Sequence, residues 1–239
     1  TPVAFKDFTQ AAVDLNDNGL YDLLVISATV AAIDREGEYY WSGHLAAPDG
    51  SELGTVYGAS QLYRDKTLAF TFFGPAIRRV GSDGAYTLRN VTITNQSMPT
   101  LTAMLPLLYT TPVIQANLFD GADFQINSSG ANAVDIDENG LYDKLIFTTT
   151  VSIPFSGTYG LSYVLLAQQP PGTEVYGMGP SHWYEQGPVQ ELVEFSGQDL
   201  AAAGIDGPFT LKFAAASYAS SAATSTSLGI VKDLFTTVA

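Results

Sequence analysis

The stretch DLNDNGLYD, residues 14–22, occurs a second time as DIDENGLYD at residues 135–143. In both copies oxygen-bearing side chains occupy the first, third, fifth and ninth positions, and glycine occupies the sixth. A loop with this spacing can turn alternate oxygens toward one centre, and Ca²⁺ accepts six to eight oxygens in irregular geometry. We therefore interpret both stretches as calcium loops and expect two bound Ca²⁺ ions, one in each.

Each loop is expected to offer four side chains and one backbone carbonyl. The carbonyl belongs to the seventh position, and the ninth-position carboxylate would bind directly or through water. Gly19 and Gly140 permit the positive φ that such a reversal requires. The predicted metal ligands are Asp14, Asn16, Asn18, Leu20 and Asp22 in the first loop, and Asp135, Asp137, Asn139, Leu141 and Asp143 in the second.

One part of the EF-hand pattern is missing from both copies. The twelfth position, where a glutamate normally binds calcium through both oxygens, is Val25 in one copy and Ile146 in the other. The apolar, β-branched residues there favour strands, so these are EF-hand-type loops in a β fold. A remaining ligand must come from elsewhere: Asp83 and Asp206, at matching places, are either such remote ligands or the first residues of turns. Because the second loop has three candidate carboxylates and the first has two, we expect tighter binding at the second.

Aspartate, asparagine and glycine also form turns that bind no metal. The alternative interpretation is therefore two simple turns. The ninth-position aspartate, which no turn requires, is present in both copies and favours metal binding.

Bulk composition narrows the classes of function. The 239 residues are 46% hydrophobic and 14% charged, with a net charge of −14 and no cysteine. Such a chain folds and lacks the basic surface that nucleic acid or an anionic membrane would require. We expect no membrane insertion, since no apolar stretch is long enough to span a bilayer. Calcium loops that fill at extracellular concentrations indicate a secreted or cell-surface protein, with any export signal upstream of Thr1.

A second internal match indicates where each repeat begins. The tripeptide TPV at residues 1–3 recurs at 111–113, and the YTT before it, residues 109–111, recurs as FTT at 235–237. We infer two tandem domains, residues 1–110 and 111–239, within a longer chain, and the last few residues would begin a further repeat. The alternative is chance similarity between threonine-rich ends.

Short β-prone runs separated by Gly, Pro and Asp turns predict an all-β fold. Each domain is expected to be an antiparallel β-sandwich, immunoglobulin-like or jelly-roll-like. Residues 74–81 and 197–204 carry helix-favouring patterns, so each sandwich should contain one short helical turn.

The order of motifs resembles accessory β-sandwich modules that are appended to secreted bacterial and archaeal proteases and to von Willebrand-type surface proteins. The resemblance rests on the metal loop, on Gly-x-Tyr at 37–39 and 157–159, and on GSDGAYTL at 81–88 matched by GIDGPFTL at 204–211. It implies calcium-stabilised, non-catalytic extracellular modules, acting as structural spacers or in adhesion, with a protein or glycan partner that the sequence does not identify.

Two alternative functions remain open. Trp183 and Tyr184 lie in a loop-like, Gly- and Pro-rich setting, where exposed aromatics could bind a carbohydrate. The chain could also be an accessory domain of a secreted hydrolase. Neither His44 nor His182 has a recognisable nucleophile or metal partner in the sequence, so we expect no catalytic site in the chain itself.

Overall fold

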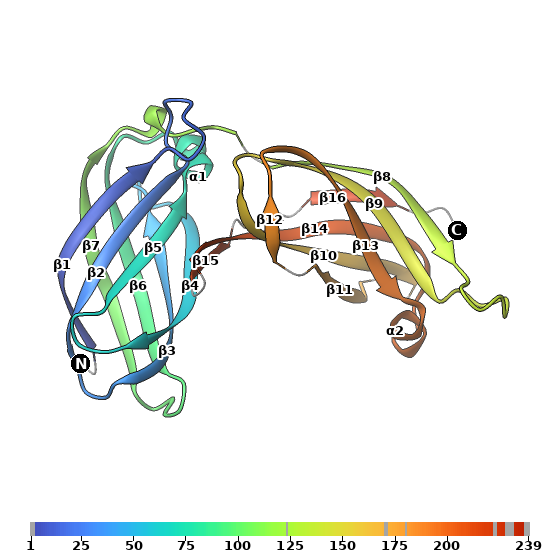
Figure 1. The fold of residues 1–239 in the computed structure, drawn as a ribbon, viewed down its shortest axis with the longest axis horizontal. Helices are drawn as coiled ribbons and strands as arrows, with labels where there is room; N and C mark the ends of the chain where they lie inside the picture. Colours follow the sequence, from blue (N-terminus) through green and yellow to red (C-terminus); the bar gives the residue numbers. More distant parts are fainter. Residues whose placement is uncertain are drawn as a thin grey trace. The chain divides into compact units, whose positions relative to one another are not determined.

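The computed structural model describes residues 3–122, 124–169, 172–179, 181–221, 224–227 and 232–236, and its strand ladders are antiparallel (Figure 1). Contacts between residues divide the chain into two compact units. Unit 1 comprises Thr1–Ala122 with Tyr218–Leu228, and unit 2 comprises Asp123–Ser217 with Gly229–Ala239. The break at residue 122 lies after the end of β7 (Thr102–Ile114), a strand that includes residues 110 and 111.

Unit 1 contains two antiparallel sheets. The first has the order β1-β2-β5 and the second the order β4-β3-β6-β7. A short strand, β15, pairs with β4, so residues near the end of the chain extend the second sheet. The elements are β1 (Val3–Val13), β2 (Leu23–Ile33), β3 (Gly37–Ala46), β4 (Glu52–Leu62), β5 (Thr67–Phe73), α1 (Gly74–Val80), β6 (Gly84–Asn95), β7, the 3₁₀ helix η1 (Ala116–Leu118) and β15 (Thr224–Ser227).

The core of unit 1 lies between these sheets. Alternate residues of β2, from Leu24 to Val30, are completely or almost completely buried, as expected for a strand with one face in a core. Trp41 of β3 packs edge-on against Phe70 of β5, with ring centroids 5.0 Å apart, and joins the two layers. The prediction of a β-sandwich is confirmed for this unit.

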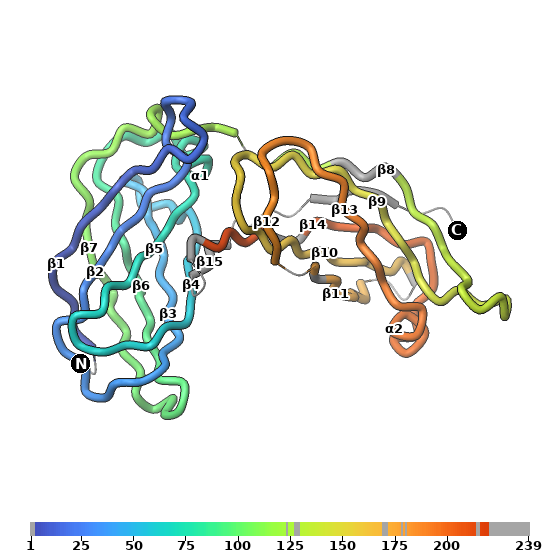
Figure 2. The backbone as a smooth tube through the Cα atoms, in the orientation of Figure 1, coloured from blue at the N-terminus to red at the C-terminus, as the bar shows by residue number. Residues whose placement is uncertain are grey.

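Unit 2 repeats the strand order of unit 1, and Figure 2 traces its strands β9, β10, β13 and β14. One sheet has the order β8-β9-β13, which matches β1-β2-β5. In the other, β10 pairs with β11 and β14 pairs with β16. The short β12 also pairs with β10 and has no counterpart among the described residues of unit 1. The elements are β8 (Gln125–Val134), β9 (Lys144–Ile153), β10 (Gly157–Gln169), β11 (Glu174–Met178), β12 (His182–Tyr184), β13 (Gly187–Ser196), α2 (Gly197–Ala202), β14 (Asp206–Ser221) and β16 (Lys232–Thr236).

The predicted short helices are present in both units. Pro75 lies at the start of α1, and Gly81 closes it in the left-handed conformation with φ of 68°. The Ser196 side chain caps α2 by accepting a hydrogen bond from the Asp199 N–H. No helix in the described ranges is long and apolar enough to cross a membrane.

Candidate metal centres

The first predicted loop connects β1 and β2 beside α1 (Figure 1). Its backbone folds around its own side chains: Gly19 N–H donates to Asp14 Oδ2 at 2.8 Å, and Leu20 N–H donates to Asn18 Oδ1 at 2.8 Å. Gly19 has φ of 83° and Asp17 has φ of 56°, so the reversal uses left-handed residues where the motif places them.

The second loop, between β9 and the preceding β8, has the same internal bonds. Gly140 N–H donates to Asp135 Oδ2 at 2.8 Å, and Leu141 N–H donates to Asn139 Oδ1 at 2.8 Å. The left-handed positions are again the fourth and sixth, Glu138 and Gly140, with φ of 58° and 87°. Two stretches of sequence far apart in the chain therefore form one loop conformation.

The ninth-position aspartate closes each loop. Asp22 Oδ2 accepts the Leu15 N–H at 2.7 Å, and Asp143 Oδ2 accepts the Ile136 N–H at 2.6 Å. This backbone bond explains why the aspartate recurs even before any metal is considered. The other oxygen of Asp22, Oδ1, accepts the Asn16 Nδ2–H at 3.3 Å, so this carboxylate is held by two donors of its own loop.

Each short helix supports the loop of its own unit. The first residue of α1, Gly74, donates its N–H to the Asp22 carbonyl at 2.7 Å, and Gly197 of α2 donates to the Asp143 carbonyl at 2.7 Å. A Cβ on Gly74 would lie 2.5 Å from the Tyr21 carbonyl oxygen, and one on Gly197 would overlap that of Tyr142. Only glycine permits this close approach of helix and loop.

The second loop gathers three carboxylates. One oxygen from each of Asp135, Asp137 and Asp143 lies within 4.8 Å of the other two. A second observation concerns Asp135: its Oδ1 is buried and has no hydrogen-bond partner within the described part of the chain. A buried acceptor without a donor is costly, and three like charges at this spacing repel one another. A hard cation with oxygen ligands would satisfy both, so these residues fit Ca²⁺.

The first loop acquires a third carboxylate from a distant segment. A parallel bridge joins Tyr21 to Phe119, in which Tyr21 N–H donates to the Leu118 carbonyl at 2.8 Å and Asp120 N–H donates to the Tyr21 carbonyl at 2.9 Å. This bridge places Asp120 against the loop, where its Oδ2 accepts Asn18 Nδ2–H at 2.6 Å. Asp120 is 8% exposed and Asp22 only 1%.

The pKa values of the two buried carboxyls at this loop, Asp22 and Asp120, are shifted in opposite directions. Burial raises the pKa of Asp22, the Leu15 N–H acts to lower it, and the charges of Asp120 and Asp14 raise it further. Burial also acts to raise the pKa of Asp120, but N–H donors from Ala122 and from the asparagine side chains outweigh it and hold that pKa below its ordinary value. Burial is thus the main cause of the raised pKa of Asp22, and the negative charges of Asp120 and Asp14 nearby are a smaller cause.

The structure places neither proposed remote ligand against its loop. Asp83 is exposed, and its Oδ1 accepts the Ala116 N–H at 2.8 Å, which fastens the start of η1. Asp206 is exposed at the first residue of β14. Asp83 thus lies just before β6, and Asp206 begins β14. Sequence reasoning missed Asp120, because the strand bridge that brings it to residue 22 has no local sequence pattern.

Asp120 adds a third carboxylate beside the first loop. Counting it, each loop has three candidate carboxylates. Among the described residues, however, only the second loop brings one oxygen from each of three carboxylates within 4.8 Å of one another, so tighter binding at the second loop stays a prediction. The second loop is more open, since Tyr142 is 69% exposed whereas the equivalent Tyr21 is half-buried and its ring packs edge-on against Phe119 at 5.7 Å.

The two aromatics proposed for carbohydrate binding point in different directions. Tyr184 is 4% exposed and belongs to the core of unit 2, where its ring lies 6.2 Å from that of Tyr159. Trp183 is 61% exposed, and its Nε1–H donates to Glu185 at 3.3 Å. Only Trp183 is available for stacking.

Comparison with known proteins does not assign the chain. No protein-family model matches the sequence, and no curated protein matches it. Among solved structures, a DUF4785 family protein from Legionella pneumophila is similar with a TM-score of 0.29 and 12% identity, over 92% of this chain and 54% of that one. A red sea bream transglutaminase is similar with a TM-score of 0.27 and 9% identity, over 91% of this chain and 29% of that one. The chain thus spans about half of the first protein, and at these scores neither similarity bears on function.

Proposed function

We propose that the chain is a calcium-stabilised, non-catalytic module of a secreted or cell-surface protein, where it acts as a structural spacer or an interaction and adhesion domain. The observation that carries this proposal is the arrangement in the second loop. Three carboxylate oxygens lie within 4.8 Å of one another, and one buried aspartate oxygen has no hydrogen-bond partner within the described residues.

The mechanism is thermodynamic linkage. A cation that binds only the folded loop stabilises the folded state by RT ln(1 + [L]/Kd), which is about 2.7 kcal/mol at a hundredfold excess over Kd. The ion of the first loop would be held by Asp14, Asn16, Asn18 and Asp22, and Asp120 would complete that site. The ion of the second loop would be held by Asp135, Asp137, Asn139 and Asp143. Because each loop joins two strands and contacts a helix, an ion there would stiffen one end of each sandwich.

Thermal unfolding with controlled calcium tests the proposal. The melting temperature should fall when chelator removes calcium, recover when Ca²⁺ is returned, and recover less with Mg²⁺, which demands smaller and more regular octahedral sites. Asp137→Asn, which changes an exposed ligand with no structural bond to another segment among the described residues, should reduce the calcium-dependent gain. A melting temperature that is the same with chelator and with calcium would refute the proposal.

A second candidate function is carbohydrate binding through Trp183. This function is favoured by the position of the indole, which is 61% exposed and does not belong to the buried core. Binding to a glycan array that is lost in Trp183→Ala, while Tyr57→Ala retains it, would support this function. Tyr57 is a suitable control because it is an exposed aromatic of unit 1. Failure to bind any glycan would end it.

A further inference from the structure

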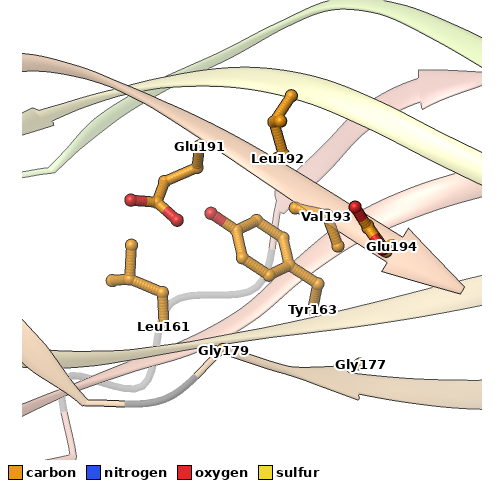
Figure 3. Close-up of a pocket in the computed structure, with 8 residues that line it drawn as sticks. All are labelled: Leu161, Tyr163, Gly177, Gly179, Glu191, Leu192, Val193 and Glu194. Carbon is orange, nitrogen blue, oxygen red and sulfur yellow. The ribbon is translucent and has the colours of Figure 1, made fainter.

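Unit 2 contains a cavity of about 190 Å³ along the side where β13 faces β10 and β11 (Figure 3). We call it the Glu191 slot. Its walls come from β13, an edge strand of one sheet, and from β10 and the edge strand β11 of the other, and none of its lining residues belongs to the loop at 135–143. The slot is lined by Leu161, Tyr163, Gly177, Glu191, Val193 and Glu194, among others.

Glu191 occupies a position that the strand pattern reserves for the core. Along β13, alternate residues face inward, and the next two in the series, Val193 and Phe195, are 6% and 3% exposed. Glu191 belongs to the same face, and 18% of its side chain is exposed. A carboxylate in such a place loses much of its hydration, which is costly unless a cation or hydrogen bonds compensate.

Hydrogen-bond donors compensate for part of this cost. The Tyr184 hydroxyl hydrogen-bonds Glu191, and the Tyr163 hydroxyl points toward the same carboxylate (Figure 3). A basic group beside it is the imidazole of His182, with Nε2 3.6 Å from Glu191 Oε1, and this imidazole carries a full charge only when protonated. Among the ion pairs of the described residues, none joins Glu191 to lysine or arginine.

The neighbouring Glu194 shows what a structural carboxylate on this strand looks like. Its side chain is 45% exposed, and its Oε2 lies 2.7 Å from Lys144 Nζ on the adjacent β9. Glu194 is thus neutralised by a lysine of its own sheet. Glu191, three residues earlier on the inward face, has two hydroxyls and a weak base in place of that lysine.

The shape and chemistry of the slot favour one kind of ligand. Leu161 and Val193 provide apolar walls, and the carboxylate with the Tyr163 hydroxyl provides a polar end. The volume equals that of about six water molecules, too large for a bare ion. An aliphatic chain that ends in an ammonium group would contact the walls and place its charge on the carboxylate.

We propose that the Glu191 slot binds a primary alkylammonium group, supplied either by a lysine side chain of a partner protein or by a free aliphatic amine. Glu191 accepts a charge-assisted hydrogen bond from the ammonium group, and Leu161 and Val193 contact the aliphatic chain. The proposal does not rest on calcium, because none of these residues belongs to a metal loop.

Two-dimensional NMR of the full chain at pH 7 tests it with two probes, Nα-acetyl-lysine methylamide for a peptide lysine and cadaverine for a free amine. Saturable shifts should appear at residues 161–163 and 191–193. Glu191→Gln should weaken binding about tenfold or more, since it removes the charge and keeps the shape. Glu174→Gln, which changes an exposed carboxylate of the same unit that accepts the Tyr176 hydroxyl and does not line the slot, should leave binding within about twofold.

Tyr163→Phe provides a second variant in case Glu191→Gln alters the fold. It keeps the ring that packs at 5.3 Å from Phe213 and removes only the hydroxyl, so it should weaken amine binding while the spectrum stays folded. Preference for the lysine derivative would indicate a protein partner, and preference for cadaverine a free amine. The proposal is overturned if neither amine shifts these resonances, if Glu191→Gln binds as well as the wild type, or if methyl glucoside binds in place of the amines.

Discussion

At the scale of single residues, Asp120 changes how the first loop would hold a cation. The residue is placed there by main-chain bonds to Tyr21, and its carboxylate already contacts Asn18. A ligand that is fixed before binding loses little freedom when the ion arrives. If the first loop binds calcium, Asp120 is therefore the residue outside the loop that we expect to contribute most to its affinity.

We therefore predict that Asp120→Asn lowers the calcium affinity of the first loop about tenfold, because ligand charge count tunes affinity in such loops. Asp83→Asn is the matched control: it changes an aspartate of the same unit that bonds Ala116 and should leave affinity unchanged. Isothermal titration calorimetry of both variants measures this. Equal affinities in the two variants would show that Asp120 is not a ligand.

Tyr163 gives a residue-scale prediction on pH. Burial raises its pKa to about 12, the Thr149 hydroxyl acts to lower it, and the charge of Glu191 raises it further. The unfolded chain ionises its tyrosines near pH 10, so this contribution to stability is complete below about pH 10 and is lost as pH rises toward 12.

The expected loss across that interval is about 2 kcal/mol, and Tyr163→Phe should lack it. Chemical denaturation of wild type and variant at successive pH values between 9 and 12 measures the effect. The free energy of unfolding of the wild type should fall by about 2 kcal/mol more than that of the variant over this range. Parallel curves for the two proteins would contradict a raised pKa at this site.

At the scale of elements, the contact between each short helix and its candidate metal loop leaves no room for a Cβ on the first residue of the helix. A side chain on Gly197 would overlap the Tyr142 carbonyl oxygen and displace Asp143, whose carbonyl accepts the Gly197 N–H. We predict that Gly197→Ala destabilises the protein by about 2 kcal/mol or more and weakens calcium binding at the second loop.

Gly130→Ala is the control for that variant. A Cβ on Gly130 would meet no atom within 4 Å, so the substitution should change stability by about 1 kcal/mol or less. Calorimetric titration and thermal unfolding of both variants provide the measurement. A Gly197→Ala protein that melts and binds calcium like the Gly130→Ala protein would show that the close approach is not required.

The loops, helices and strands that have a local sequence pattern could be predicted from the sequence alone. The two loops follow from their oxygen spacing and glycine, α1 from Pro75 and Gly81, and the strands from their alternation. Asp120, the pairing of β15 with β4 and the inward-facing Glu191 depend instead on long-range strand pairing. Such pairing is fixed by the packing of the whole sheet, which no short window of sequence contains.

At the scale of the whole molecule, the ligands of each candidate site come from one unit only. The first site uses the loop at 14–22 and Asp120, all in unit 1, and the second uses the loop at 135–143 in unit 2. Calcium should therefore act on the stability of each unit through its own loop, with about 2.7 kcal/mol at a hundredfold excess over each Kd.

Paired variants of the equivalent ninth-position aspartates test this. Asp22→Asn should remove the calcium-dependent protection of unit 1 alone, and Asp143→Asn that of unit 2 alone, because asparagine keeps the acceptor for the Leu15 or Ile136 N–H while losing the charge. Hydrogen exchange followed by mass spectrometry, with calcium and with chelator, assigns the change to residues of each unit. If either variant abolished protection equally in both units, calcium would be coupling them, and the description of two separately stabilised sandwiches would have to be abandoned.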